Sequence, residues 1–157
     1  MTTRPNSADA ALTASRALVA ISARSLSAIG DLTLPQFRAL VVLASHGPTT
    51  SSDLAAALSV HASTVTRMVD RLAGKGLVER STPADRREVV VAVTAAALDV
   101  VGAVTESRRR EMAAVMDRIP PARRAAVVAA FQEFATAAGE VPDSEWSAVL
   151  NPPSPGG

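Results

Sequence analysis

The stretch from Ser59 to Arg80, SVHASTVTRMVDRLAGKGLVER, constrains the fold of this chain most strongly, because one helix within it has two chemically different sides. A helix that begins near Ala62 places four large apolar residues on one side: Val65, Met68, Val69 and Leu72. The other side carries Ser63, Thr66, Arg67 and Asp70. The first side is therefore expected to face a protein core. The second offers short hydroxyls and arginine to a partner outside.

A change of periodicity follows this helix. Gly74 and Gly76 are expected to end it, and the segments 77–81 (LVERS) and 88–93 (EVVVAV) have the β-branched content and length of two strands joined by a turn. The valines Val89, Val91 and Val93 are expected to alternate inward. A helix pair followed by a hairpin predicts a winged helix-turn-helix, so the chain is expected to be mainly α with a small β-hairpin wing.

Apolar periodicity predicts further helices on both sides of this unit. They cover 9–29, a segment from Pro35 to His46, about two turns after a cap at Thr50 with Asp53 three residues on, 95–119, and 121–138. Arg108–Arg110 interrupt the apolar pattern of 95–119, and a solvated face, a phosphate contact and an anion pocket all remain open for them. Residues 139–157 are rich in proline and glycine and predict a flexible tail, with Trp146 as a candidate anchor.

Composition limits the function classes. A chain of 157 residues with 48% hydrophobic residues is enough for one cored domain. The sequence has no cysteine, so disulfides, thiolate metal sites and cysteine nucleophiles are excluded, which fits the cytosol. It has no apolar run of about 18 residues. Metal-ligand spacing, a Gly-rich phosphate loop and a nucleophile elbow are also missing, so we expect no enzyme, no cofactor, no metal site and no membrane partner.

The net charge of +1 conceals an uneven distribution along the chain. All sixteen Lys and Arg residues lie in 1–124 beside eleven acids, a net of +5, whereas 125–157 carries four acids and no Lys or Arg, a net of −4. A basic body with an acidic end is consistent with a polyanionic partner, although a net of +5 over 124 residues is weak evidence by itself.

The segment SSDLAAALSVHASTVTRMVDRLAGKGLVERSTPADRREVVVAVT resembles the DNA-binding core of the MarR family of bacterial transcription regulators. The resemblance is close over 49–94 and looser over 8–138. It implies a single domain over 8–138, with a winged helix-turn-helix core at 34–94 and dimerisation helices at 9–29, 95–119 and 121–138. It also implies a homodimer on a pseudo-palindromic operator. Ser59 departs from the pattern, because glycine is common at this turn.

The candidate DNA contacts lie on the helix and on the wing tip. Ser63, Thr64, Thr66 and Arg67 suit base edges in a major groove, and Arg71 and Lys75 can reach phosphates. Asp70 is expected to orient Arg67 or Arg71, or to face solvent. In the tip, Arg87 matches the family's Asp-x-Arg pattern and is expected in the minor groove, Arg86 near the backbone, and Asp85 as a brace.

The resulting prediction is a cytoplasmic, dimeric regulator of transcription, most often a repressor in this family. The resemblance implies a site for a small phenolic or other organic anion between the dimerisation helices and the DNA-reading head. Release of DNA by such a ligand and constitutive binding to DNA both remain open. The alternative is a winged helix that docks protein partners without operator binding. Arginines directed outward from both helix and wing favour double-stranded DNA.

Overall fold

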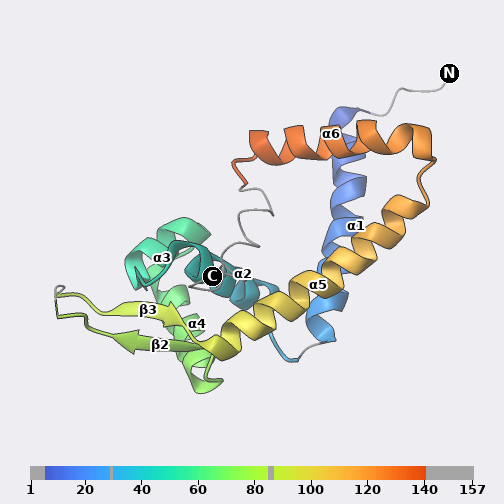
Figure 1. Cartoon of the computed structure of the whole chain (residues 1–157). Coiled ribbons are helices and arrows are strands. Elements are labelled where there is room, and N and C mark those ends of the chain that lie inside the picture. The colour runs from blue at the N-terminus through green and yellow to red at the C-terminus, as the bar shows by residue number, and fades with distance from the viewer. Residues whose placement is uncertain (1–5, 29, 85–86, 141–157) are drawn as a thin grey trace, which may run out of the picture.

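The computed structural model describes residues 6–28, 30–84 and 87–140 (Figure 1). Its helices are α1 (Ser7–Ser27), α2 (Leu34–His46), α3 (Ser51–Leu58), α4 (Ala62–Gly74), α5 (Ala95–Asp117) and α6 (Pro121–Ala137). Its strands are β1 (Thr49–Thr50), β2 (Val78–Ser81) and β3 (Val90–Val93). The mainly helical class with a small wing is confirmed. Of the described helices, none combines the length and the apolar character needed to cross a membrane.

Short polar side chains set the helix starts. Asn6, Thr33, Thr50 and Thr94 each accept a hydrogen bond from a backbone N–H in the first turn of the helix that follows. The cap predicted at Thr50 is confirmed, because its Oγ1 accepts from the Asp53 N–H at 3.1 Å and donates to Asp53 Oδ2 at 2.8 Å. Helix ends agree with the sequence prediction to within two residues, except that Ile29 lies outside the described residues.

The sheet differs from the expected hairpin in two respects. It has three strands in the order β1-β3-β2, all antiparallel, with Thr49 opposite Val91 and Val78 opposite Val93. The inward alternation predicted from Val89 was wrong at its start: Val89 is 52% exposed, whereas Val90 and Val91 are both buried. Strand β3 begins only at Val90, which is paired with both β1 and β2, and the two adjacent valines at its start point to opposite faces of the sheet and are both buried.

The core lies where α2, α3, α4, the base of the wing and the first half of α5 meet. Its fully buried members include Leu40, Leu43, Leu54, Val69, Leu72 and Val101. Helix α1 packs along α5, where Arg24 Nη2 lies 2.8 Å from Glu111 Oε2 and the buried Ser25 hydroxyl donates to Glu111 Oε1 at 3.3 Å. The long helix α5, unbroken through Arg108–Arg110, thus connects the winged helix to α1 and α6 (Figure 1).

Apolar surface remains open on the helices distant from the wing. All residues of α6 are described, and none of their side chains is buried. Phe131 and Phe134 in α6 are 44% and 64% exposed, and Leu12 and Val19 in α1 are each 56% exposed. The tail predicted for 139–157 lies beyond the described residues from Val141 onward.

Candidate nucleic-acid interface

Helix α4 is anchored on one side and open on the other. Val65, Val69 and Leu72 are completely buried and Met68 nearly so, which fixes the rotation of the helix about its axis. Ser63, Thr64, Thr66, Arg67 and Arg71 are all exposed. The Thr66 hydroxyl donates to the Ala62 carbonyl oxygen at 3.1 Å, so its oxygen is left to accept from outside. The two-sided helix predicted from the sequence is therefore present.

The turn between α3 and α4 fixes the direction in which α4 leaves the core. Ser59 adopts a left-handed conformation with φ 55°, its N–H donates to the Ala56 carbonyl oxygen, and the Val60 N–H donates to that of Ala55 at 3.0 Å. This is a Schellman ending of α3 with serine at the position where glycine is commonest. His61 then occupies the N-cap of α4 and makes no side-chain capping bond. The first turn of α4 therefore has N–H groups available for an anion.

Asp70 connects α4 to the wing. Its Oδ1 lies 2.5 Å from Arg80 Nη2 on β2. The expectation that Asp70 orients Arg67 or Arg71 was wrong, because its partner lies ten residues further along the chain, on β2. The alternative, that Asp70 faces solvent, agrees with a side chain that is 58% exposed. The ion pair joins the two elements that would contact DNA.

Lys75 is also held by a partner that the sequence did not indicate. Its ammonium group donates to the Asp31 carboxylate and, at 3.2 Å, to the Asp31 carbonyl oxygen, in the connection between α1 and α2. This hydrogen bond and the positive charge of Lys75 lower the pKa of Asp31 below its usual value. Only 28% of the Lys75 side chain is exposed. Its ammonium can therefore contact a phosphate only by leaving Asp31 or by bonding to Asp31 and the phosphate together.

The wing projects beyond α3 and α4 (Figure 1). Arg87 is exposed at the end of the hairpin, before β3. Asp85 and Arg86 lie outside the described residues. The structure therefore brings Ser63, Thr64, Thr66, Arg67 and Arg71 together on one helix face, places Arg87 on the wing, and turns Lys75 toward the α1–α2 connection. Among the described residues, no three His, Cys, Asp or Glu side chains are grouped to hold a metal ion.

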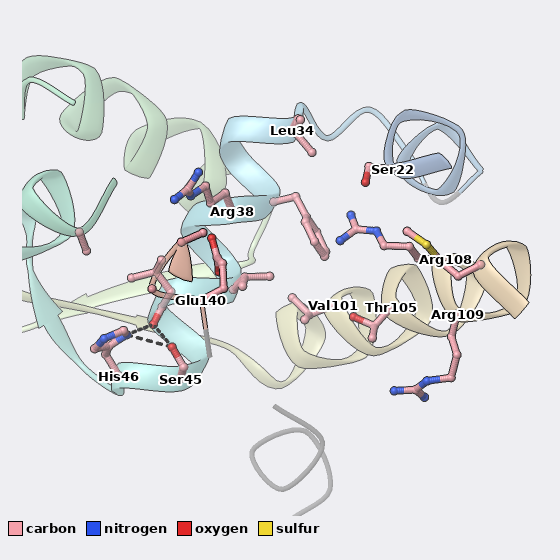
Figure 2. A pocket seen from close by; sticks show the side chains of 17 residues that line it. Ser22, Leu34, Arg38, Ser45, His46, Val101, Thr105, Arg108, Arg109 and Glu140 are labelled. Atoms are coloured by element: carbon pink, nitrogen blue, oxygen red, sulfur yellow. Dashed lines mark hydrogen bonds between the residues drawn. The ribbon is translucent and has the colours of Figure 1, made fainter. Parts of the chain in front are cut away.

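A cavity of about 940 Å³ lies between the winged helix and the long helices. Phe37, Val41 and Val101 form much of its apolar wall, and Arg38, Arg108 and Arg109 supply positive charge. Figure 2 shows Arg108 reaching from α5 toward α2, where its guanidinium carbon lies 5.2 Å from the centre of the Phe37 ring. Two of the three arginines whose role the sequence left open thus line an anion-compatible cavity.

Sequence reasoning missed Asp31, Arg80 and the contribution of Arg38 to this cavity. Asp31 and Arg80 act through partners distant in sequence, and Arg38 lines a cavity that forms only when α2 packs against α5. Only Arg108–Arg110 carried a detectable signal, as a charged interruption of an apolar stripe.

The comparisons with known proteins agree with this geometry. The family model described as MarR family matches residues 32–89. The HTH-type transcriptional regulator YfiV of Bacillus subtilis is 32% identical over 98 residues, which cover 62% of this chain and 61% of YfiV. The HTH-type transcriptional repressor NicR of Pseudomonas putida is 32% identical over 99 residues, 62% of this chain and 63% of NicR. The matches thus span somewhat under two thirds of these relatives.

Solved structures extend the similarity over most of the chain. The crystal structure of RV1404 from Mycobacterium tuberculosis is 47% identical, with a TM-score of 0.81 over 86% of this chain and 93% of that one. A mutant of MepR from S. aureus, solved bound to an oligodeoxyribonucleotide, has a TM-score of 0.66 at 19% identity, covering 84% of this chain and 97% of that one. The second likeness concerns the fold alone.

Proposed function

Because this chain belongs to the MarR family of transcriptional regulators, we propose that it binds operator DNA in a sequence-specific manner and regulates transcription in the cytoplasm. The observation that carries the proposal is the outer face of α4, where hydroxyls and arginines stand on a helix whose inner face is completely buried. A helix fixed in this way can enter a major groove without changing its rotation.

The candidate contacts divide by role. Ser63, Thr64, Thr66 and Arg67 read base edges, with Arg67 donating to a guanine. Arg71 and Lys75 contact phosphates, the latter after its ammonium leaves Asp31. On the wing, Arg87 enters the minor groove, Arg86 lies near the backbone, and Asp85 braces them.

The proposed active species is a homodimer. Residues 8–138 act as one domain in which α1, α5 and α6 bury their exposed apolar side chains against a second copy. A two-fold protein places its two α4 helices in major grooves about one helical turn apart, so the operator is a pseudo-palindrome. The name of NicR, a transcriptional repressor, supports repression as the direction of control.

The cavity between α2 and α5 is the proposed effector site. Its aliphatic and aromatic wall and its arginines suit a small organic anion of the phenolic type. Binding there contacts both the DNA-reading head, through α2, and the dimerisation helices, through α5, so an effector can change the relative position of the two DNA-reading heads.

Sequencing the DNA recovered with the full-length protein tests the proposal. The expected result is a set of fragments that share a pseudo-palindrome, and a labelled copy of that sequence should bind with an affinity that falls steeply as salt rises. Recovery of random fragments, with binding of a partner protein instead, would favour the winged-helix interaction module.

A further inference from the structure

Three arginines contribute positive charge to the wall of the cavity between α2 and α5. Arg38 contributes from α2, and Arg108 and Arg109 from α5. Among the described residues that line the cavity, the one acid is Glu140, at the end of the described chain. Arginines grouped on one cavity wall favour an anionic occupant, and the neighbouring aliphatic side chains favour one that also has apolar groups.

The chain leaves α6 at this same cavity. Ala138, Gly139 and Glu140 all line it, and the Glu140 N–H donates to the Ala135 carbonyl oxygen at 3.0 Å, which fixes the exit. Gly139, with φ 75°, makes the turn that ends the helix. The residues that follow Glu140 therefore start at the cavity wall.

The next ten residues, VPDSEWSAVL, have the chemistry that the cavity selects. They carry two acids, Asp143 and Glu145, one large aromatic residue, Trp146, and no lysine or arginine. Six extended residues reach up to about 20 Å, which is enough to bring Trp146 from Glu140 into the cavity. At about 940 Å³ the cavity lies near the upper end of sizes seen for ligand sites, so a small phenolic acid alone would leave much of it unfilled.

We propose that residues 141–150 bind in this cavity as an internal ligand, with Asp143 and Glu145 paired to arginines of the wall and Trp146 against its apolar side. An organic anion would then have to displace the segment, so its apparent affinity would be lower than its intrinsic affinity. This consequence for effectors rests on the proposed function, whereas binding of the segment does not.

Trp146 makes the proposal directly measurable, because it is the one tryptophan of the chain. In the full-length protein without DNA, its emission should be blue-shifted and protected from acrylamide. The double substitution Asp143→Asn and Glu145→Gln should shift the emission to the red and raise the quenching constant severalfold. Raising the salt from about 0.1 M to 1 M, which shortens the screening length from about 10 to 3 Å, should act in the same direction.

Adjacent arginines offer a matched control. Arg109 and Arg110 both pair with Glu106, at 3.1 and 3.7 Å, but of the two only Arg109 lines the cavity. Arg109→Ala should expose Trp146, and Arg110→Ala should not. Arg108 is unsuitable for this test because its guanidinium packs over the core residue Phe37.

Two results would overturn the proposal. One is a Trp146 that is solvent-like in the unmodified protein. The other is a shielded Trp146 that responds equally to Arg109→Ala and Arg110→Ala, since the segment would then bind elsewhere. Operator binding measured on the same samples distinguishes failure of the internal-ligand proposal from failure of the proposed function. A protein that binds operator while Trp146 is solvent-exposed contradicts the internal ligand alone.

Discussion

At the scale of single residues, Ser59 is placed at a conformational cost. Among the described residues other than glycine, it is the one with positive φ, and a left-handed conformation costs an L-residue roughly 1–2 kcal/mol. Ser59→Gly should therefore raise the free energy of unfolding by about 0.5–1 kcal/mol, since glycine avoids the clash but loses more chain entropy. Urea titration measures this. Ser52→Gly, in the helical part of α3, is the control and should give no gain.

Arg67 is the residue on which base readout depends most. Arg67→Ala should weaken operator binding by about 1–3 kcal/mol and non-specific binding much less, because a base-edge contact carries discrimination. Arg118→Ala is the matched control: it removes an exposed arginine at the other end of α5, a helix of 23 residues and therefore about 34 Å long. Fluorescence anisotropy with operator and scrambled DNA measures both. Equal losses on both DNAs would show that α4 does not read bases.

The Asp31–Lys75 pair predicts opposite effects of two substitutions. Asp31→Asn removes the carboxylate that holds Lys75, so all DNA sequences should bind more tightly and the salt slope should steepen, whereas Lys75→Ala should weaken all of them and reduce the slope by about one. A series of affinities against salt concentration measures this. Unchanged slopes in both variants would mean that Lys75 serves the fold alone.

The pH dependence of the Asp31–Lys75 pair follows from the direction in which the pKa of Asp31 is shifted. The pKa of Asp31 is lowered in the folded protein, so the stabilisation is present above the usual aspartate pKa, near 4, and is lost as the pH falls through the folded value. Between pH 5 and 8, Asp31 therefore stays ionised.

At the scale of elements, the wing is expected to act as a rigid probe. Strand β3 is paired on both edges, and Arg80 ties β2 to α4, so Arg87 stands on a fixed support. Arg87→Ala should reduce operator affinity without changing the midpoint of thermal unfolding. If Asp85 is its brace, Asp85→Ala should remove part of the same energy, and the double variant should lose less than the sum of the single losses. Strictly additive losses of operator affinity would show that Asp85 does not act through Arg87.

Local chemistry explains which elements were predictable. The α4 pattern, the cap at Thr50 and the Gly76 turn depend on neighbours in sequence, and all three are present. Strand β1 has two residues, too few for any periodicity, and it exists because β3 offers an edge. The partners of Asp70 and Lys75, ten and forty-four residues away, are set by packing, which a single helix pattern does not contain.

At the scale of the whole molecule, the open apolar surface predicts association. Phe131 and Phe134 are exposed on α6, and burying an aromatic side chain contributes roughly 1.5–3 kcal/mol. Phe131→Glu should therefore weaken dimerisation by at least about tenfold, since it also buries a charge. Gln132→Glu adds the same charge on the next position of α6 and should have a smaller effect. Sedimentation measures both, and a micromolar monomer that binds operator tightly would contradict the dimer.

Thr50 and Thr94 determine which segment could be transplanted between related proteins to exchange their DNA specificity. Thr50 pairs with Val90 in the sheet and also caps α3, while Thr94 caps α5, donates its N–H to the Leu77 carbonyl oxygen and its hydroxyl to that of Gly76 at 2.7 Å. The segment from α3 to the end of the wing is thus bonded to two elements at each of its ends. A chimaera that exchanges the wing alone separates these bonded partners, and one that exchanges α4 alone separates Asp70 from Arg80. A transplantable cassette therefore has to run from before Thr49 to beyond Ala97.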